Sequence, residues 1–149
     1  MKKHGLIVFL CLILLVIPGC EKGSTDWVKF KTDQDGNRYS FSRRSIESDS
    51  ERQRVKVLIK EVYSDVGKTV ELQSRIKDGL TIQGYDNLSY KTSGYEIDCR
   101  KGKIAVLAIN HYDQSGRIIY AGAETRDKQW YDIQPDTVGD ALQRQVCPH

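Results

Sequence analysis

Apolar and polar residues alternate along much of this chain, a pattern that predicts short β-strands with one buried face. Val28 and Phe30 alternate with polar neighbours, and Tyr39 and Phe41 do the same a few residues later. Strands are predicted over 27–31, 38–42, 53–63, 104–112, 117–123 and 130–133, and over the stretch in which Tyr95, Ile97 and Cys99 share one face. The chain from Tyr85 onward is therefore expected to be rich in β-structure.

Clusters of turn-forming residues separate several of these strands. Residues 33–37 (Asp-Gln-Asp-Gly-Asn) lie between the first two strands and predict a hairpin. Residues 113–116 (Asp-Gln-Ser-Gly) predict a second hairpin between 104–112 and 117–123, and Lys101-Gly102 predicts a tight connection. The segment 104–112 is apolar on both faces, which favours a central strand.

Two segments change to a helical period. In 68–77, Leu72 and Ile76 are four residues apart, and Val70 and Leu80 extend the apolar stripe, which we expect to face the core. Asp78-Gly79 predicts where this helix ends. A strand is the alternative, because Thr69 and Val70 favour it.

The second helix is predicted near the C-terminus. Asp136 or Thr137 can cap it, and its apolar stripe is formed by Val138, Ala141, Leu142 and Val146. Taken together, the strands and helices predict an α+β fold: a small antiparallel β-sheet with a short central helix and a C-terminal helix.

The N-terminal segment has the layout of a secretory signal. Lys2 and Lys3 precede a 12-residue apolar run from Leu6 to Ile17, which is shorter than the roughly 20 residues that span a bilayer. The sequence Ile17-Pro18-Gly19-Cys20 resembles the lipobox of bacterial lipoproteins, although Pro18 departs from the small residue usual there. The resemblance implies a signal peptide over 1–19 and an acylated, palmitate-bearing Cys20 at the start of a tether over 20–26. The alternative is an ordinary secretory signal with an incidental cysteine.

The remaining cysteines indicate a disulfide. Cys11 lies in the signal segment and Cys20 is assigned to lipid, which leaves Cys99 and Cys147 in a protein exported to an oxidising compartment. Only one internal pairing is then available, so we expect a Cys99–Cys147 bridge that staples the C-terminal helix to the sheet. Two free buried thiols are the alternative.

The charge of the chain gives no argument for nucleic acid as a partner. Without Lys2 and Lys3 the chain holds 21 basic and 20 acidic residues. Residues 43–54 contain four arginines, which a heparin-like polyanion could contact. Acidic residues are interleaved with them, so a solvated loop is the favoured interpretation.

We find no recognisable catalytic or metal-binding pattern. His111 is predicted to lie near a strand end, on one face with Ala105, Leu107 and Ile109, and a base paired with Asp113 is the functional alternative. Ser93 and Ser115 fall in predicted turns, no His/Cys set has zinc spacing, and no glycine-rich loop opens a helix. The sequence therefore predicts no enzyme activity, no cofactor and no metal. Most aromatic residues are expected in the core, with Trp27 as a candidate interface residue because it faces away from Val28 and Phe30.

Four ordered segments resemble a known family of bacterial lipoproteins. They are Tyr95-Glu96-Ile97-Asp98-Cys99, Tyr112-Asp113-Gln114-Ser115-Gly116, Trp130-Tyr131-Asp132-Ile133-Gln134-Pro135 and Val146-Cys147. Their order and spacing are similar to those of the surface-adhesin protein E-like domain, here over 27–149.

The resemblance implies a small antiparallel sheet packed with helix and held by one disulfide. It also implies a non-enzymatic binding or adhesion module at the cell surface, whose partners are host or envelope proteins. A periplasm-facing structural lipoprotein is the alternative. Glu21 replaces the aspartate associated with inner-membrane retention, so by analogy with lipoprotein sorting we expect the outer membrane.

Overall fold

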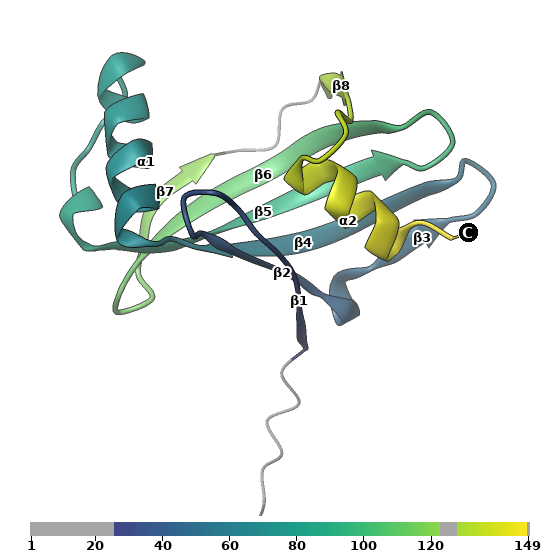
Figure 1. Ribbon diagram of the computed structural model, residues 1–149, viewed down its shortest axis with the longest axis horizontal. Helices are drawn as coiled ribbons and strands as arrows, with labels where there is room; N and C mark the ends of the chain where they lie inside the picture. The colour runs from purple at the N-terminus through teal and green to yellow at the C-terminus, as the bar shows by residue number, and fades with distance from the viewer. Residues whose placement is uncertain (1–25, 123–127, 149) are drawn as a thin grey trace, which may run out of the picture.

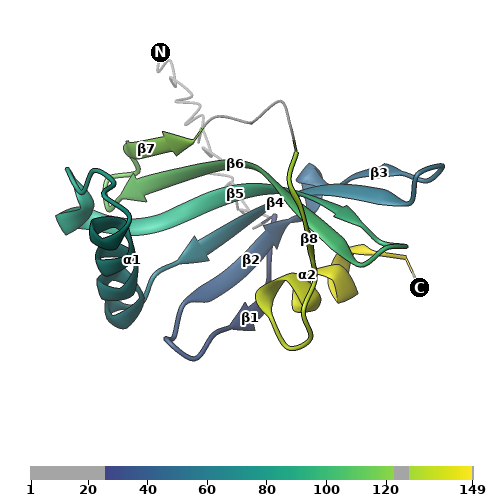
Figure 2. The ribbon, with the colours of Figure 1, turned by 90° about the horizontal axis from the view of Figure 1, so that it is seen from above.

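A single antiparallel sheet organises the chain, and both α-helices lie on the same side of it (Figures 1 and 2). The computed structural model describes residues 26–122 and 128–148. The strands are β1 (Trp27–Thr32), β2 (Arg38–Ser42), β3 (Glu47–Asp49), β4 (Arg54–Val62), β5 (Leu88–Asp98), β6 (Lys103–Asp113), β7 (Ile118–Gly122) and β8 (Trp130–Asp132). The helices are α1 (Asp65–Lys77) and α2 (Val138–Val146), with short 3-10 turns η1 (Arg43–Ser45) and η2 (Tyr85–Asn87). The predicted α+β class is confirmed.

The sheet follows chain order along its main path, β1-β2-β4-β5-β6-β7, with β3 beside β4 and β8 beside β6. The predicted hairpins are present: β1 pairs with β2 and β6 with β7. At the first turn the Asp33 carboxylate accepts hydrogen bonds from the backbone N–H groups of Asp35 and Asn37, and Gly36 adopts a φ of +84° that favours glycine. β6 is central, as expected, because β5 lies on one side and β7 and β8 on the other.

The segment predicted as a solvated loop over 43–52 contains η1 and the short strand β3. Its arginines have acidic neighbours: Arg52 lies 3.7 Å from Asp49 and Arg44 lies 3.6 Å from Asp26. The polyanion alternative for this segment is therefore not supported, because its charges are largely compensated locally.

The face of the sheet that carries the helices holds the core. One cluster, under α2, joins Phe41, Val57, Ile59 and Ile97 to Leu142. A second and smaller cluster joins Tyr63, Tyr85 and Leu88, with Leu72 of α1 packed against it. We call this side of the sheet the helix face and the opposite side the open face.

The C-terminal helix forms as predicted. Its N-cap is Thr137, whose hydroxyl accepts a hydrogen bond from the Asp140 N–H at 3.2 Å, while Asp136 adopts a φ of +63° before it. Leu142 is almost fully buried on the sheet. Burial of this helix brings Cys147 beside the end of β5.

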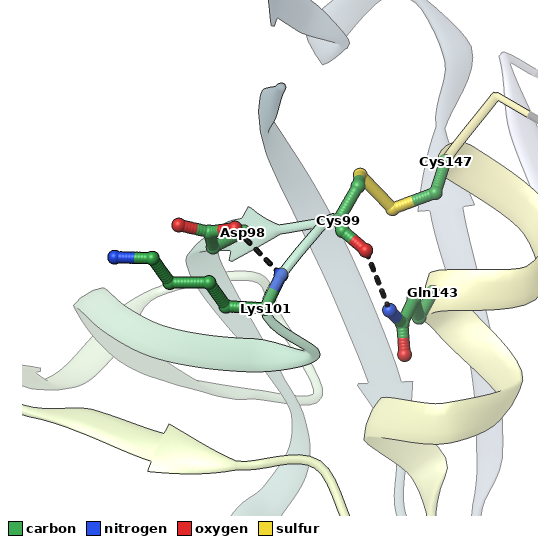
Figure 3. Close-up of a disulfide and its surroundings, with 5 residues drawn as sticks. All are labelled: Asp98, Cys99, Lys101, Gln143 and Cys147. Carbon is green, nitrogen blue, oxygen red and sulfur yellow. Dashed lines mark hydrogen bonds between the residues drawn. A yellow bond between two sulfur atoms is a disulfide. The ribbon is translucent and has the colours of Figure 1, made fainter. Parts of the chain in front are cut away.

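The predicted Cys99–Cys147 disulfide is present, with the two Cα atoms 5.7 Å apart (Figure 3). Next to it, the Gln143 side-chain amide donates to the Cys99 carbonyl at 3.5 Å. On the other side, the Asp98 carboxylate accepts a hydrogen bond from the Lys101 N–H at 2.9 Å, which tightens the turn into β6. The disulfide therefore connects α2 to an end of the sheet that is also held by these hydrogen bonds.

Candidate binding surface

Helix α1 begins and ends on clear local signals. The Ser64 hydroxyl accepts a hydrogen bond from the Gly67 N–H at 2.9 Å, which caps the first turn. At the other end Gly79 N–H donates to the Ile76 carbonyl and Leu80 N–H donates to the Arg75 carbonyl, the paired bonds of a Schellman motif. The predicted stop at Asp78-Gly79 is confirmed.

The orientation of α1 corrects the sequence prediction. The stripe of Val70, Leu72, Ile76 and Leu80 was expected to face the core, but of these Leu72 alone packs against the buried cluster. Val70, Ile76 and Leu80 are exposed, while Arg75 is buried. The helix therefore turns polar side chains toward the sheet and apolar side chains toward solvent.

Polar groups on the sheet account for this orientation. The Tyr63 hydroxyl donates to the Glu71 carboxylate at 3.2 Å, and the His111 Nδ1 lies 3.8 Å from the other oxygen of that carboxylate. The Tyr85 hydroxyl lies 3.0 Å from His111 Nδ1. The residue that follows β4, strand β6 and turn η2 thus all contribute polar groups beneath α1.

Arg75 is the most buried charge on the helix. Its guanidinium lies over the rings of Tyr85 and Tyr120, at 4.3 and 4.6 Å from the ring centroids, and its Nε donates to the Thr81 carbonyl at 2.9 Å. Stacking on two aromatic faces stabilises a desolvated cation. Arg75 therefore fixes the end of α1 against the sheet and the loop after it.

A buried ion pair continues this polar cluster across the helix face. Lys91 Nζ lies 2.8 Å from the Glu61 carboxylate, and the Glu61 residue is almost fully buried. Burial lowers the pKa of Lys91, but the Glu61 carboxylate raises it and the net shift is upward. Burial and the charges of Glu61 and Glu71 raise the pKa of Tyr63. Lys91 and the Tyr63 hydroxyl therefore both stay protonated near neutral pH.

His111 does not form the base that sequence analysis considered. Burial, and then the positive charges of Lys91 and Arg75, lower its pKa to about 4, so the imidazole is neutral at pH 7. Asp113, the proposed partner, instead accepts hydrogen bonds from Ser115 and Arg117, and these lower its pKa to about 2. Burial raises the pKa of the Tyr85 hydroxyl, the closest polar neighbour of His111, to about 12. This arrangement holds a neutral imidazole in place between the Tyr85 hydroxyl and the Glu71 carboxylate.

The prediction of which residues share a strand face with His111 is also partly wrong. It was expected to share a face with Ala105, but the register between β5 and β6 shifts near Leu107. This bulge moves Ala105 to the open face, where it pairs with Glu96, while His111 pairs with Lys91 on the helix face. A bulge of one residue reverses the alternation, and nothing in the local sequence marks it.

The outward side of α1 and the loop after it form an exposed apolar surface. We call Val66, Val70, Ile76, Leu80 and Ile82 the α1 apolar surface; each is between 45% and 58% exposed. Exposed apolar side chains that gather on one element are typical of an interaction site. Trp27, the aromatic residue singled out from the sequence, is half-buried. The more exposed apolar side chains therefore lie on α1 and in the loop after it, not at Trp27.

The described residues contain no group of three or more His, Cys, Asp or Glu side chains placed to hold a metal ion. Within the same part of the chain, no helix is both long and apolar enough to cross a bilayer. Cys20, the predicted lipid attachment site, and Cys11 lie outside the described residues.

Comparison with known protein families identifies the family of this chain. The profile of the family described as surface-adhesin protein E matches residues 27–148. The chain belongs to this family. No curated protein sequence matches the chain.

Solved structures support the same fold for this member of the surface-adhesin protein E family. The selenomethionine form of Haemophilus influenzae protein E matches with a TM-score of 0.52 and 14% sequence identity, covering 83% of this chain and 86% of that chain. A second crystal form of the same Haemophilus influenzae protein matches with a TM-score of 0.52 and 11% identity, covering 83% and 87%. At this level of identity the likeness concerns the fold.

One signal in the sequence could have revealed the buried polar cluster. Glu61 continues the alternation of Val57 and Ile59, so the period of two already places its carboxylate on the buried face. A buried carboxylate needs a partner. The identity of that partner, Lys91 on β5, depends on the register between strands and could not be read from β4 alone.

Proposed function

We propose that this protein is a lipid-anchored, non-enzymatic adhesin of the bacterial cell surface, and that it contacts protein partners through the α1 apolar surface. Membership of the surface-adhesin protein E family supports a surface adhesin-like role. The choice of this surface rests on the exposure of Val66, Val70 and Ile76. The helix could have buried these side chains, but it buries Arg75 instead.

The support for a binding role comes from how the helix is held. Polar contacts from Glu71 and Arg75 to the sheet fix which side of α1 faces outward. A few buried side chains near the centre of an interface supply most of the binding free energy in protein complexes. A helix with a fixed orientation presents such anchors with little loss of conformational freedom on binding.

The support for a non-enzymatic role comes from the polar cluster itself. His111 is 3% exposed and Glu61 is 4% exposed, so neither side chain is open to a substrate. Their partners are supplied by other residues of the fold, namely Tyr85 for His111 and Lys91 for Glu61. The polar cluster therefore serves to hold α1 on the sheet.

The function is tested by adherence of intact bacteria to cultured animal cells. Replacing Val66, Val70 and Ile76 together by serine keeps similar helix propensity and should reduce adherence roughly fivefold or more, because a few apolar anchors dominate interfaces. Ile118→Ser is the matched control, since Ile118 is 57% exposed on β7 and lies outside the α1 apolar surface. Equal adherence of the triple variant and wild type would contradict the choice of surface.

Protease treatment of intact cells separates the two orientations. A surface adhesin is degraded while the outer membrane is whole. A periplasm-facing structural lipoprotein, the alternative function, is degraded only after the membrane is permeabilised. The second result would overturn the adhesin proposal.

A further inference from the structure

The open face of the sheet carries neither of the two α-helices, which both pack on the helix face (Figure 2). The side chains on the open face follow from the strand registers. One row runs across five strands: Lys29 on β1, Ser40 on β2, Lys60 on β4, Thr92 on β5 and Asn110 on β6. The next row holds Arg38, Val62, Tyr90 and Tyr112.

These two rows contain three cations and no acidic residue. Lys29 and Arg38 are exposed and Lys60 is half-buried. Among the described residues, none of the three has a carboxylate within 4.0 Å. Neighbouring strands are about 4.8 Å apart, so Lys29 and Lys60 lie about 10 Å from one another across the sheet. The result is a compact patch of uncompensated positive charge, which we call the basic rows.

The other end of the open face differs in charge. There Glu96 lies 2.6 Å from Lys128 and 3.6 Å from Arg54, and Asp98 lies 3.6 Å from the same arginine. Cations and carboxylates therefore compensate one another around Arg54. The positive charge of the open face is concentrated in the basic rows and not spread over the whole sheet.

The aromatic residues of the basic rows form a rigid platform. The rings of Tyr90 and Tyr112 stack with centroids 4.6 Å apart and planes 10° apart. Lys60 Nζ lies 4.1 Å from the centroid of the Tyr90 ring, and the Thr92 hydroxyl lies 3.4 Å from the Tyr112 hydroxyl. These contacts hold Lys60 in place and leave hydroxyl and amide groups beside the cations.

We propose that the basic rows bind a sulfated polysaccharide lying across the strands. Sulfate groups would pair with Lys29, Arg38 and Lys60, and sugar hydroxyls would form hydrogen bonds with Ser40, Thr92 and Asn110. The argument is charge complementarity combined with this row of uncharged donors and acceptors, since a sulfated sugar chain offers anions and hydroxyls in alternation.

Two other anionic partners fit less well. A protein interface is centred on well-packed, desolvated side chains, whereas the row from Lys29 to Asn110 holds only charged and hydrogen-bonding side chains. An anionic bilayer surface favours exposed apolar or aromatic side chains that insert among the lipids, whereas Tyr90 and Tyr112 cover one another and Trp27 is half-buried. The polysaccharide is therefore the partner that uses most of the groups present.

The test measures binding of the purified full-length protein to immobilised heparin as a function of salt. We expect wild-type protein to bind and to lose affinity steeply with salt, because each ion contact releases counterions from the polyanion. Lys29→Ala/Arg38→Ala/Lys60→Ala should weaken binding about tenfold or more and flatten the salt dependence. The matched control is Lys77→Ala/Arg100→Ala/Lys101→Ala, which removes the same charge from exposed positions away from the basic rows.

The outcomes separate the possible anions. The proposal is supported if heparin binds, if the first triple variant loses affinity and the control does not, and if polyglutamate and anionic phosphatidylglycerol vesicles bind more weakly. Vesicle binding is scored against neutral vesicles, so that an acyl anchor contributes equally to both. Absence of heparin binding, equal loss in the control variant, or preferential binding of polyglutamate or of anionic vesicles would each overturn it. None of these readouts depends on the α1 apolar surface.

Discussion

His111 illustrates how a single residue depends on distant parts of the chain. Its ring is surrounded by Tyr63, Tyr85 and Tyr120, with centroid distances of 5.5 to 6.3 Å. Tyr63 directly follows β4, Tyr85 lies in η2 and Tyr120 lies in β7. His111 was correctly predicted to lie near the end of a strand, but the sequence does not show which aromatic rings surround it. Only the strand order brings them together.

We predict that the stability of the protein falls as the pH decreases from 6.5 to 4. The pKa of His111 in the folded protein is about 4, below its ordinary value of 6.5. Over this interval the unfolded chain takes up a proton that the folded protein does not, so the free energy of unfolding decreases with falling pH. The loss is on the order of 2–3 kcal/mol. Urea unfolding at pH 7, 5.5 and 4.5 measures it, and His111→Gln should remove this part of the pH dependence. An unchanged profile in that variant would contradict the assignment to His111.

Gly67 shows a second residue whose role lies outside its own element. A Cβ atom at this position would overlap the side-chain amide of Asn37. That amide is fixed, because its oxygen accepts from the Ser64 N–H at 3.0 Å and its nitrogen donates to Asp33 at 3.0 Å. The start of α1 therefore lies directly on the β1–β2 turn.

Gly67→Ala is expected to destabilise the protein by about 1–3 kcal/mol through overpacking. Helix propensity alone would predict a gain of about 1 kcal/mol, so the sign of the effect is diagnostic. Gly139→Ala in α2 is the matched control, since its Cβ would meet its nearest neighbours at 3.7–3.8 Å, an ordinary contact distance. Thermal melts of the two variants test the prediction, and a stabilised Gly67→Ala protein would show that α1 does not dock on Asn37.

At the scale of elements, the two helices differ in how well the sequence describes them. The stripe of α2 faces the core as predicted, with Leu142 buried, because its apolar residues meet an apolar part of the sheet. The stripe of α1 faces solvent, because the sheet beneath it carries Tyr63, Tyr85 and His111. A helical period in the sequence distinguishes the apolar side of a helix from its polar side. Which side is buried depends on the partner surface, and that information lies in other segments.

The disulfide should determine whether α2 stays on the sheet. Cys99 and Cys147 are 48 residues apart in sequence, and removal of such a bridge costs about 2–5 kcal/mol. We expect Cys99→Ser/Cys147→Ser to melt at a lower temperature than wild type and to be cleaved by trypsin first at Arg144, the exposed arginine of α2. Identical melting temperatures would show that packing of Leu142 holds α2 without the bridge.

At the scale of the whole molecule, hairpins were predictable and strand order was partly so. Asp33 and Gly36 mark the β1–β2 turn and Gly116 marks the β6–β7 turn, each with local turn chemistry. The pairing of β8 with β6 beside β7 involves no local turn and could not be predicted from the segment 130–133. The binding surfaces depend on this global arrangement, so neither the α1 apolar surface nor the basic rows could be located from the sequence.

Membrane attachment is predicted to depend on Cys20. Stable anchoring takes more than one acyl chain, and the lipoprotein resemblance implies several on one cysteine. Cys20→Ser should abolish incorporation of labelled palmitate and prevent normal maturation. Fractionation and mass spectrometry of the variant provide the measurement, with Cys11→Ser as the matched control. Unchanged mature mass and unchanged membrane partitioning of Cys20→Ser would rule out the lipoprotein assignment.

The polar docking of α1 has a consequence for its motion. Because Glu71 and Arg75 hold the helix over a cluster that is smaller than the one under α2, lifting it from the sheet exposes less apolar surface than global unfolding does. Urea sensitivity and heat-capacity change both scale with exposed surface. Amide hydrogens of α1 should therefore exchange through a local opening that is less sensitive to urea than global unfolding, while those of β4 exchange through global unfolding. A helix that opens in this way can adjust its tilt to an approaching partner without disturbing the core beneath α2.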